Sequence, residues 1–147
     1  MEQRDSHRPI LLVEDNPNDE LLTLRGLKKS NLTNEIVVAR DGAEALDYLF
    51  GTGQYAGRDV QKMPVVVLLD LKLPKLDGID VLRRIRSDER LRFLPVVILT
   101  SSRADRDMVD SYQLGANAYV TKPVEYADFI QSIGQLGLFW AVVNQPL

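Results

Sequence analysis

Residues 65–78 read VVVLLDLKLPKLDG, and the feature that decides the fold is the apolar run of residues 65–69, which ends on a carboxylate at Asp70. A short run of this kind is typical of a strand that is buried on both faces, as the strands of a parallel sheet are. A charge inside such a strand costs several kcal/mol unless another group pairs with it. We therefore expect Asp70 to lie at the end of a buried strand, in a site built around charge.

Four more apolar runs alternate with segments of helical periodicity. The runs occupy residues 10–13, 36–39, 96–99 and 118–120. The apolar side chains of the five helical segments are Leu21, Leu22, Leu24 and Leu27; Leu46, Leu49 and Phe50; Val81, Leu82 and Ile85; Met108, Val109 and Tyr112; and Phe129, Ile130, Ile133, Leu136 and Trp140. Five strand–helix repeats predict an α/β fold with one doubly wound, mainly parallel five-stranded sheet and helices on both faces.

Local signals mark the limits of some of these segments. Pro17, followed by Asp19 and Glu20, is typical of a helix start, because acidic side chains are favourable in the positive first turn. Residues 51–63 contain three glycines and show no periodicity, so we expect an exposed loop there. No linker, internal repeat or low-complexity segment divides the chain, which predicts a single domain.

The composition excludes several classes of protein. Hydrophobic residues make up 45% of the 147 residues and charged residues 27%, as in globular proteins. A net charge of -3 gives no reason to expect nucleic acid or an anionic membrane as partner. The absence of cysteine excludes thiol catalysis and thiolate metal sites, and no segment resembles a secretory signal or a membrane span. We expect one cytoplasmic domain over residues 1–147, with its core at about 8–140.

Polar residues follow the apolar runs at the point where each run ends. Glu14 and Asp15 follow the first run, Asp70 the third, Thr100 the fourth, and Thr121 with Lys122 the fifth. In an open parallel sheet these ends share one edge, where ligands bind at the switch in strand order. The sequence therefore predicts that these carboxylates, hydroxyls and one ammonium group meet in a single site.

Three neighbouring carboxylates cannot all ionise readily at neutral pH without a cation. Lys122 offsets one charge, and the remainder suits a hard divalent ion with oxygen ligands. Magnesium is the best candidate because no histidine or cysteine is near; the only histidine, His7, lies in the polar N-terminal segment. Such a site is suited to handling a phosphoryl group, with Thr100 and Lys122 as donors to its oxygens.

Each of these features also has an ordinary structural explanation. Asp70 alone is more often a turn or helix cap, and Glu14 with Asp15 are equally consistent with a helix start. A threonine after a strand most often caps a helix, and a lysine before a proline is usually surface charge next to a turn. The joint placement at four strand ends is what favours a functional site.

These residues resemble the receiver domain of two-component response regulators, and the resemblance extends from residue 10 to about residue 140. The segment ILLVEDNP carries the paired acids, and VVLLDLKLPKLDG carries a D-x-x-x-P-x-x-x-G pattern at Asp70, Pro74 and Gly78. PVVILTSS carries the switch hydroxyl, and GANAYVTKP carries the lysine and its proline. The resemblance implies a flavodoxin-like sheet with strand order 2-1-3-4-5.

The resemblance also implies the chemistry of the acidic residues. Asp70 is expected to accept a phosphoryl group from a phosphohistidine on a sensor histidine kinase. Asp15, Asp70 and the backbone carbonyl of Lys72 are expected to hold Mg2+, with Glu14 acting largely through water. A receiver of this kind is a signalling phosphoacceptor with weak self-phosphorylation and self-dephosphorylation chemistry, and we do not expect an enzyme.

Further implied roles concern the switch. Thr100 is expected to move toward the phosphoryl group while the ring of Tyr119 turns inward to fill the vacated space. Lys122 is expected to bind a phosphoryl oxygen, and the Lys122–Pro123 bond is expected to be cis. The fourth helix, fifth strand and last helix form the dimer face of resembling regulators, so we expect a homodimer through this surface and an unknown downstream protein as partner.

The loop at 51–63, the segment FLPVVILTSS and the ending QLGLFWAVVNQPL are similar to the small stand-alone regulators that pair with bacterial phytochromes, which implies a phytochrome kinase as partner. The apolar side chains at Phe139 and Trp140 are explained either by core packing or by a dimer or partner contact.

Other functions remain as alternatives. A magnesium phosphohydrolase of the aspartyl-phosphate type would need a second aspartate where this chain has Lys72, and a dinucleotide-binding fold would need glycines in place of EDNPND. A pseudo-receiver, which is an interaction module that never takes phosphate, stays open, although such domains lose site residues that this chain keeps.

Overall fold

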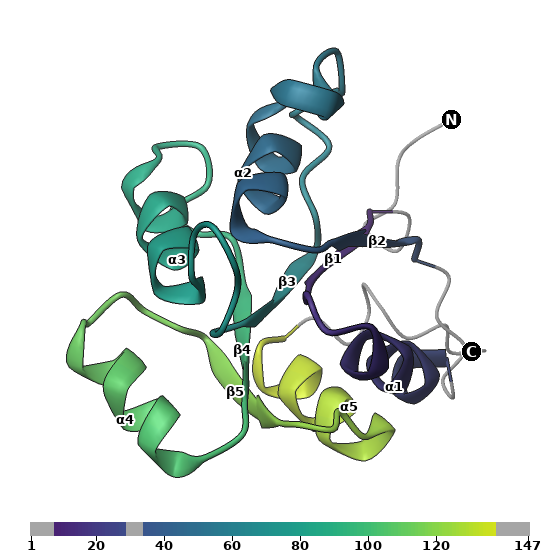
Figure 1. Cartoon of the computed structure of the whole chain (residues 1–147), viewed down its shortest axis with the longest axis vertical. Coiled ribbons are helices and arrows are strands. Elements are labelled where there is room, and N and C mark those ends of the chain that lie inside the picture. The colour runs from purple at the N-terminus through teal and green to yellow at the C-terminus, as the bar shows by residue number, and fades with distance from the viewer. Residues whose placement is uncertain (1–7, 29–33, 138–147) are drawn as a thin grey trace.

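The computed structural model describes residues 8–28 and 34–137. Its centre is a five-stranded, all-parallel sheet of order β2-β1-β3-β4-β5 (Figure 1). The strands are β1 (Ile10–Val13), β2 (Ile36–Ala39), β3 (Val66–Asp70), β4 (Val96–Thr100) and β5 (Ala118–Thr121). The predicted fold class and strand order are therefore confirmed. The third, fourth and fifth strands each extend one residue beyond the apolar run, onto the polar residue that follows it.

Helices cover both faces of the sheet. They are α1 (Pro17–Lys28), α2 (Gly42–Phe50), α3 (Gly78–Ser87), α4 (Arg103–Ser111) and α5 (Tyr126–Gln135), with a short 3-10 helix, η2 (Gly53–Tyr55). In the described ranges no helix combines the length and apolar character needed to span a bilayer. The predicted helix at Pro17 is confirmed, whereas Trp140, expected on the last helix, lies outside the described residues.

Alternate residues of each strand face two separate apolar layers. Leu11 and Val13 of β1 join the layer beneath α2, α3 and α4, and Ile10 and Leu12 join the layer beneath α1 and α5. Figure 1 shows α1 and α5 together on one side of the sheet. Because both faces are covered, the strands are continuously apolar, which is the pattern that predicted them.

The apolar positions of α1 are not all on its buried face. Leu21 and Leu22 are exposed, and the buried residues of the helix are Thr23, Gly26 and Leu27. The predicted leucine stripe is therefore only partly correct. On the buried side, Gly26 packs closely against the segment between β5 and α5: an added Cβ would lie 2.3 Å from the backbone oxygen of Val124.

Two other expectations need correction. Residues 51–63 are not a wholly exposed loop, because they contain η2 and fold back onto α2: the Arg58 guanidinium lies 3.9 Å from the ring centroid of Tyr48 and its Nε donates to the Tyr48 backbone oxygen at 2.7 Å. On α4 only Val109 is buried, while Met108 is exposed, as is Tyr112, which follows the helix.

The packing at Gly26 makes a testable prediction. Gly26→Ala should lower the free energy of unfolding by about 1–3 kcal/mol, because the new methyl group overlaps the Val124 backbone oxygen. Gly134→Ala in α5 is the matched control: nothing among the described residues lies within 4 Å of its Cβ position, so the change should stabilise by about 0.5–1 kcal/mol. Urea unfolding of both variants measures the difference. A Gly26→Ala protein as stable as the Gly134→Ala protein would show that α1 has room for the methyl group.

Candidate functional site

The parallel register of the sheet brings the polar strand ends together. Val13 at the end of β1 is paired with Leu69, so Glu14 follows beside Asp70, the last residue of β3. Beyond β3 in the same sheet, Thr100 of β4 is paired with Thr121 of β5. The Lys122 backbone amide, which follows β5, donates a hydrogen bond to the Thr100 backbone oxygen at 2.7 Å. The predicted convergence of these ends at one edge of the sheet is confirmed.

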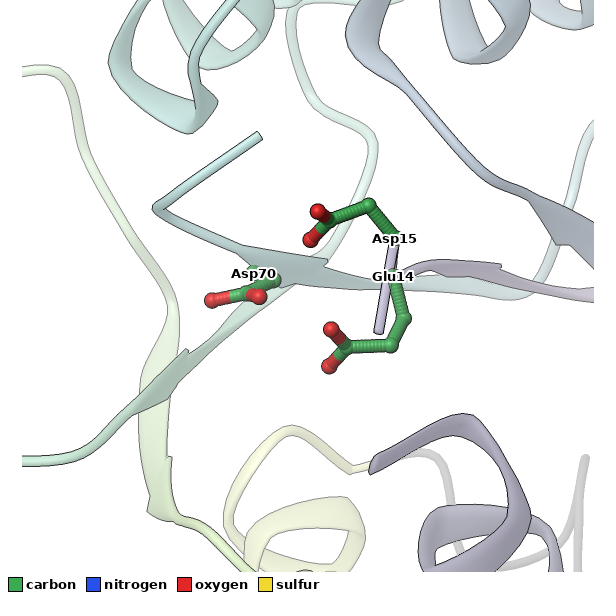
Figure 2. A group of neighbouring side chains, drawn as sticks. All are labelled: Glu14, Asp15 and Asp70. Carbon is green, nitrogen blue, oxygen red and sulfur yellow. The ribbon is translucent and has the colours of Figure 1, made fainter. Parts of the chain in front are cut away.

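Three carboxylates gather at this edge. Glu14, Asp15 and Asp70 each offer an oxygen atom, and these oxygens lie within 4.8 Å of one another (Figure 2). Glu14 is fully buried and Asp70 is 5% exposed, whereas Asp15 is exposed. Asp70 lies, as expected, at the end of a buried strand among other charged groups, and its side chain is almost fully enclosed. Three oxygen donors this close together suit a hard divalent cation.

Lys122 is the cation that balances these carboxylates in the described part of the chain. Its Nζ lies 2.9 Å from Asp19 Oδ2, 3.2 Å from Asp70 Oδ2 and 3.4 Å from Glu14 Oε1. Burial by itself lowers the pKa of the lysine, but the hydrogen bond to Asp19 and the charges of Asp70 and Glu14 outweigh it, so the pKa is raised above its usual range. The ammonium therefore stays charged at physiological pH.

Asp19 is the site residue that the sequence argument missed. It was interpreted only as an acidic residue in the first turn of a helix, and it does lie there, where the Asn16 side chain accepts a hydrogen bond from its backbone N–H. Its role depends on a contact with Lys122, 103 residues farther along the chain, so no local pattern in the sequence could have identified it.

Glu14 is held in a partly protonated state near neutral pH. Burial, followed by the hydrogen bond to Asp70 and the negative charge of Asp70, raises its pKa from 4.5 to about 7. The Asn16 backbone N–H, which donates to Glu14 Oε2 at 3.2 Å, and the charge of Lys122 oppose this rise without cancelling it. The acidic cluster is therefore short of positive charge.

The loop after Asp70 explains the spacing of the D-x-x-x-P-x-x-x-G pattern. The Gly78 amide donates to the Leu71 backbone oxygen at 2.8 Å, and a Cβ at position 78 would lie 2.5 Å from the Asp70 backbone oxygen. Glycine is needed there so that α3 can begin against the end of β3. The Lys72 amide approaches Asp70 Oδ1 at 3.4 Å, and the ligand role of the Lys72 carbonyl remains a prediction.

The two predicted switch residues occupy different surroundings. The Thr100 hydroxyl is buried and has no hydrogen-bond partner among the described residues, so it is available to an incoming acceptor. The Tyr119 hydroxyl instead donates to Asp110 Oδ1 of α4, and the Arg106 guanidinium lies 4.8 Å from its ring centroid. Burial and the Asp110 hydrogen bond raise the pKa of Tyr119. Tyr119 thus lies apart from the acidic cluster.

The Lys122–Pro123 peptide bond is cis, as the resemblance predicted. Together the edge of the sheet presents oxygen donors for a divalent cation, a charged ammonium group and a free buried hydroxyl. This set of groups can bind a metal ion and the oxygens of a phosphoryl group at the same time.

Comparison with known proteins places this site in context. A family model described as the response regulator receiver domain matches residues 10–134. The solved structure of the bacteriophytochrome response regulator AtBRR is 58% identical, covers 95% of this chain and 99% of its own, and has a TM-score of 0.87. The phosphorylated cyanobacterial phytochrome response regulator RcpA is 41% identical, with coverage of 91% and 94% and a TM-score of 0.72. The probable methanogenesis regulatory protein FilR2 of Methanothrix harundinacea is 41% identical over 92% of this chain and 85% of its own length.

The raised pKa of Glu14 predicts a pH-dependent stability in the absence of metal. The folded protein holds the Glu14 proton more tightly than the unfolded chain, so this stabilisation is present at low pH and is lost as the pH rises from about 4.5 to about 7. Glu14→Gln removes the titration. The free energy of unfolding of the parent relative to Glu14→Gln, measured in EDTA, should therefore fall between pH 5 and pH 7. A difference that does not change over this range would contradict the assignment.

Proposed function

This chain belongs to the family of response regulator receiver domains, and on that basis we propose that it is a signalling switch in which Asp70 accepts a phosphoryl group from a sensor histidine kinase. An Asp70 carboxylate oxygen forms a bond to phosphorus while the bond from phosphorus to the phosphohistidine nitrogen breaks. The observation that carries this proposal is the position of Asp70, whose carboxylate lies 3.2 Å from the Lys122 ammonium and within the acidic group of Glu14 and Asp15.

Magnesium is the cofactor that we propose for this reaction. Asp15, Asp70 and the backbone carbonyl of Lys72 would hold the ion, with Glu14 acting largely through water. When bound, Mg2+ supplies positive charge that neutralises the phosphoryl oxygens during transfer. The three clustered carboxylate oxygens and the raised pKa of Glu14 support this assignment, because both indicate a need for added positive charge.

Two side chains would then report the phosphorylated state. Lys122 would bind one phosphoryl oxygen and Thr100 another, and the free buried hydroxyl of Thr100 supports its role. Movement of Thr100 would leave space for the ring of Tyr119. Tyr119 is a residue of β5, and its hydroxyl donates a hydrogen bond to Asp110 of α4. The signal would pass to the surface formed by α4, β5 and α5, through which the protein would form a homodimer or contact a downstream protein.

The similarity to AtBRR and RcpA favours a bacterial phytochrome as the kinase, acting in the cytoplasm. Self-phosphorylation from small phosphodonors and self-dephosphorylation would be the only chemistry of the chain, which would act as a signalling phosphoacceptor and not as an enzyme with a separate substrate. The presence of every expected site residue favours this function over that of a pseudo-receiver.

Intact mass spectrometry after incubation with acetyl phosphate tests the proposal. We expect a gain of one phosphoryl group in Mg2+, no gain in EDTA, and no gain in Asp70→Asn. Asp80→Asn is the matched control, because Asp80 pairs with Arg83 on α3, away from the site, and should leave the gain intact. No gain by the parent under any condition would indicate the pseudo-receiver, and labelling of Asp70→Asn at the parent rate would refute the phosphoacceptor assignment.

Thr100→Val tests the role of the buried hydroxyl. Because Thr100 Oγ1 has no partner among the described residues, its replacement by a methyl group should leave the free energy of unfolding unchanged or raise it by about 1 kcal/mol. Phosphorylation should still occur, but the amide chemical-shift changes that it causes in β5 and α4 should be reduced. A marked loss of stability, or unchanged shifts on phosphorylation, would contradict this role.

A further inference from the structure

Lys122 has no spare hydrogen-bonding capacity in the structure. An ammonium group has three hydrogens, and three carboxylates surround Lys122 Nζ. The shortest of these contacts, at 2.9 Å, is to Asp19 and not to the phosphoacceptor Asp70. Under the proposed function, on which this inference rests, Lys122 must gain a phosphoryl oxygen, so at least one existing contact must weaken or break.

The three carboxylates differ in how readily they can release the lysine. Glu14 is fully buried, so it would be left inside the protein without its cation. Asp70 itself carries the phosphoryl group after the reaction, so its own contact with Lys122 is replaced by a contact from a phosphoryl oxygen. The side chain of Asp19 is 34% exposed, so water can solvate its carboxylate when the lysine leaves. Of the two contacts that remain, the one with Asp19 is therefore the contact that competes with the phosphoryl group for the lysine.

Asp19 is also held in place by its own helix. The Asn16 side chain accepts hydrogen bonds from the backbone N–H groups of Asn18 at 2.9 Å and of Asp19 at 3.0 Å, which fixes the first turn of α1. The carboxylate consequently holds Lys122 from the α1 side of the site, whereas Asp70 holds it from the β3 side.

We propose that Asp19 is a positioning residue that restrains the Lys122 ammonium in the unphosphorylated protein and competes with the phosphoryl group for it. The restraint opposes the movement of Lys122 to the phosphoryl oxygens and so makes the phosphorylated state less stable. Removing the charge of Asp19 should strengthen that state, although Asp19 itself contacts neither the reacting oxygen nor the phosphorus atom.

Glu20 provides a matched control. It is the next residue on α1 and carries the same charge, but its carboxylate pairs with Arg40 at 3.0 Å. Glu20→Gln therefore removes one negative charge from nearly the same place without touching Lys122. A general electrostatic effect on the site should appear in both variants, whereas the proposed restraint should appear only in Asp19→Asn.

Beryllofluoride, a non-covalent analogue of the phosphoryl group, gives the first readout. The full chain is titrated with it at saturating Mg2+ and followed by amide chemical shifts. We expect the half-saturating concentration to fall roughly two- to fivefold in Asp19→Asn, the range expected for loss of a partly exposed ion pair, and to be unchanged in Glu20→Gln. In a Lys122→Ala background, Asp19→Asn should have no further effect. Equal changes in Asp19→Asn and Glu20→Gln, or no change or weaker binding in Asp19→Asn, would overturn the proposal.

Hydrogen exchange of the Lys122 ammonium group gives a second readout that requires neither metal nor phosphate. Exchange with water should be faster in Asp19→Asn than in the parent and unchanged in Glu20→Gln; equal exchange in all three proteins would overturn the restraint.

Failure of the proposed function and failure of the role of Asp19 give different results. A parent protein that gains no phosphoryl group from acetyl phosphate refutes the proposed function, whereas normal phosphorylation with identical behaviour of Asp19→Asn and Glu20→Gln refutes only the role of Asp19.

Discussion

The ion-pair cluster around the Lys122 ammonium is the interaction on which the arrangement of the site depends. It joins Lys122, the residue that follows β5, to Asp70 of β3 and to two residues much earlier in the chain, Asp19 and Glu14, which lie 103 and 108 positions before it. Without this cation, buried carboxylates from neighbouring segments would repel one another, and the loss of hydration of each would be uncompensated. The parallel register places these side chains together, and the positive charge of Lys122 offsets the repulsion between their carboxylates.

The cluster is nevertheless incompletely balanced. One ammonium faces several carboxylates, and the pKa of Glu14 is raised to about 7 by burial and by its proximity to Asp70. The buried Thr100 hydroxyl also lacks a partner among the described residues. Groups left unsatisfied in this way are costly in an ordinary core and are therefore characteristic of functional sites. A divalent cation and a phosphoryl group would together satisfy both the charge and the hydroxyl.

The family relationship and the physical argument contribute different information. Membership of the receiver family gives Asp70, Thr100 and Lys122 their proposed roles, and these roles apply to any receiver that keeps the same residues. Asp19 enters from geometry alone, through a contact with Lys122 that is shorter than the contact of Lys122 with Asp70. The relatives include a bacteriophytochrome response regulator and a probable methanogenesis regulatory protein, so the family match by itself does not select a partner.

The sequence alone determined the five strands, their parallel arrangement and the polar residues at their ends, because a continuous apolar run and its final residue are local features. The order of the strands in the sheet was predicted only through the resemblance to receiver domains. The tertiary structure decided which face of α1 is buried, because that depends on the close approach of Gly26 to Val124 across the fold. It also decided that Asp19 pairs with Lys122, a contact across 103 residues that no local pattern encodes. The periodicity of a sequence indicates which residues are buried. Which acidic side chains pair with Lys122 is decided only when distant segments pack together.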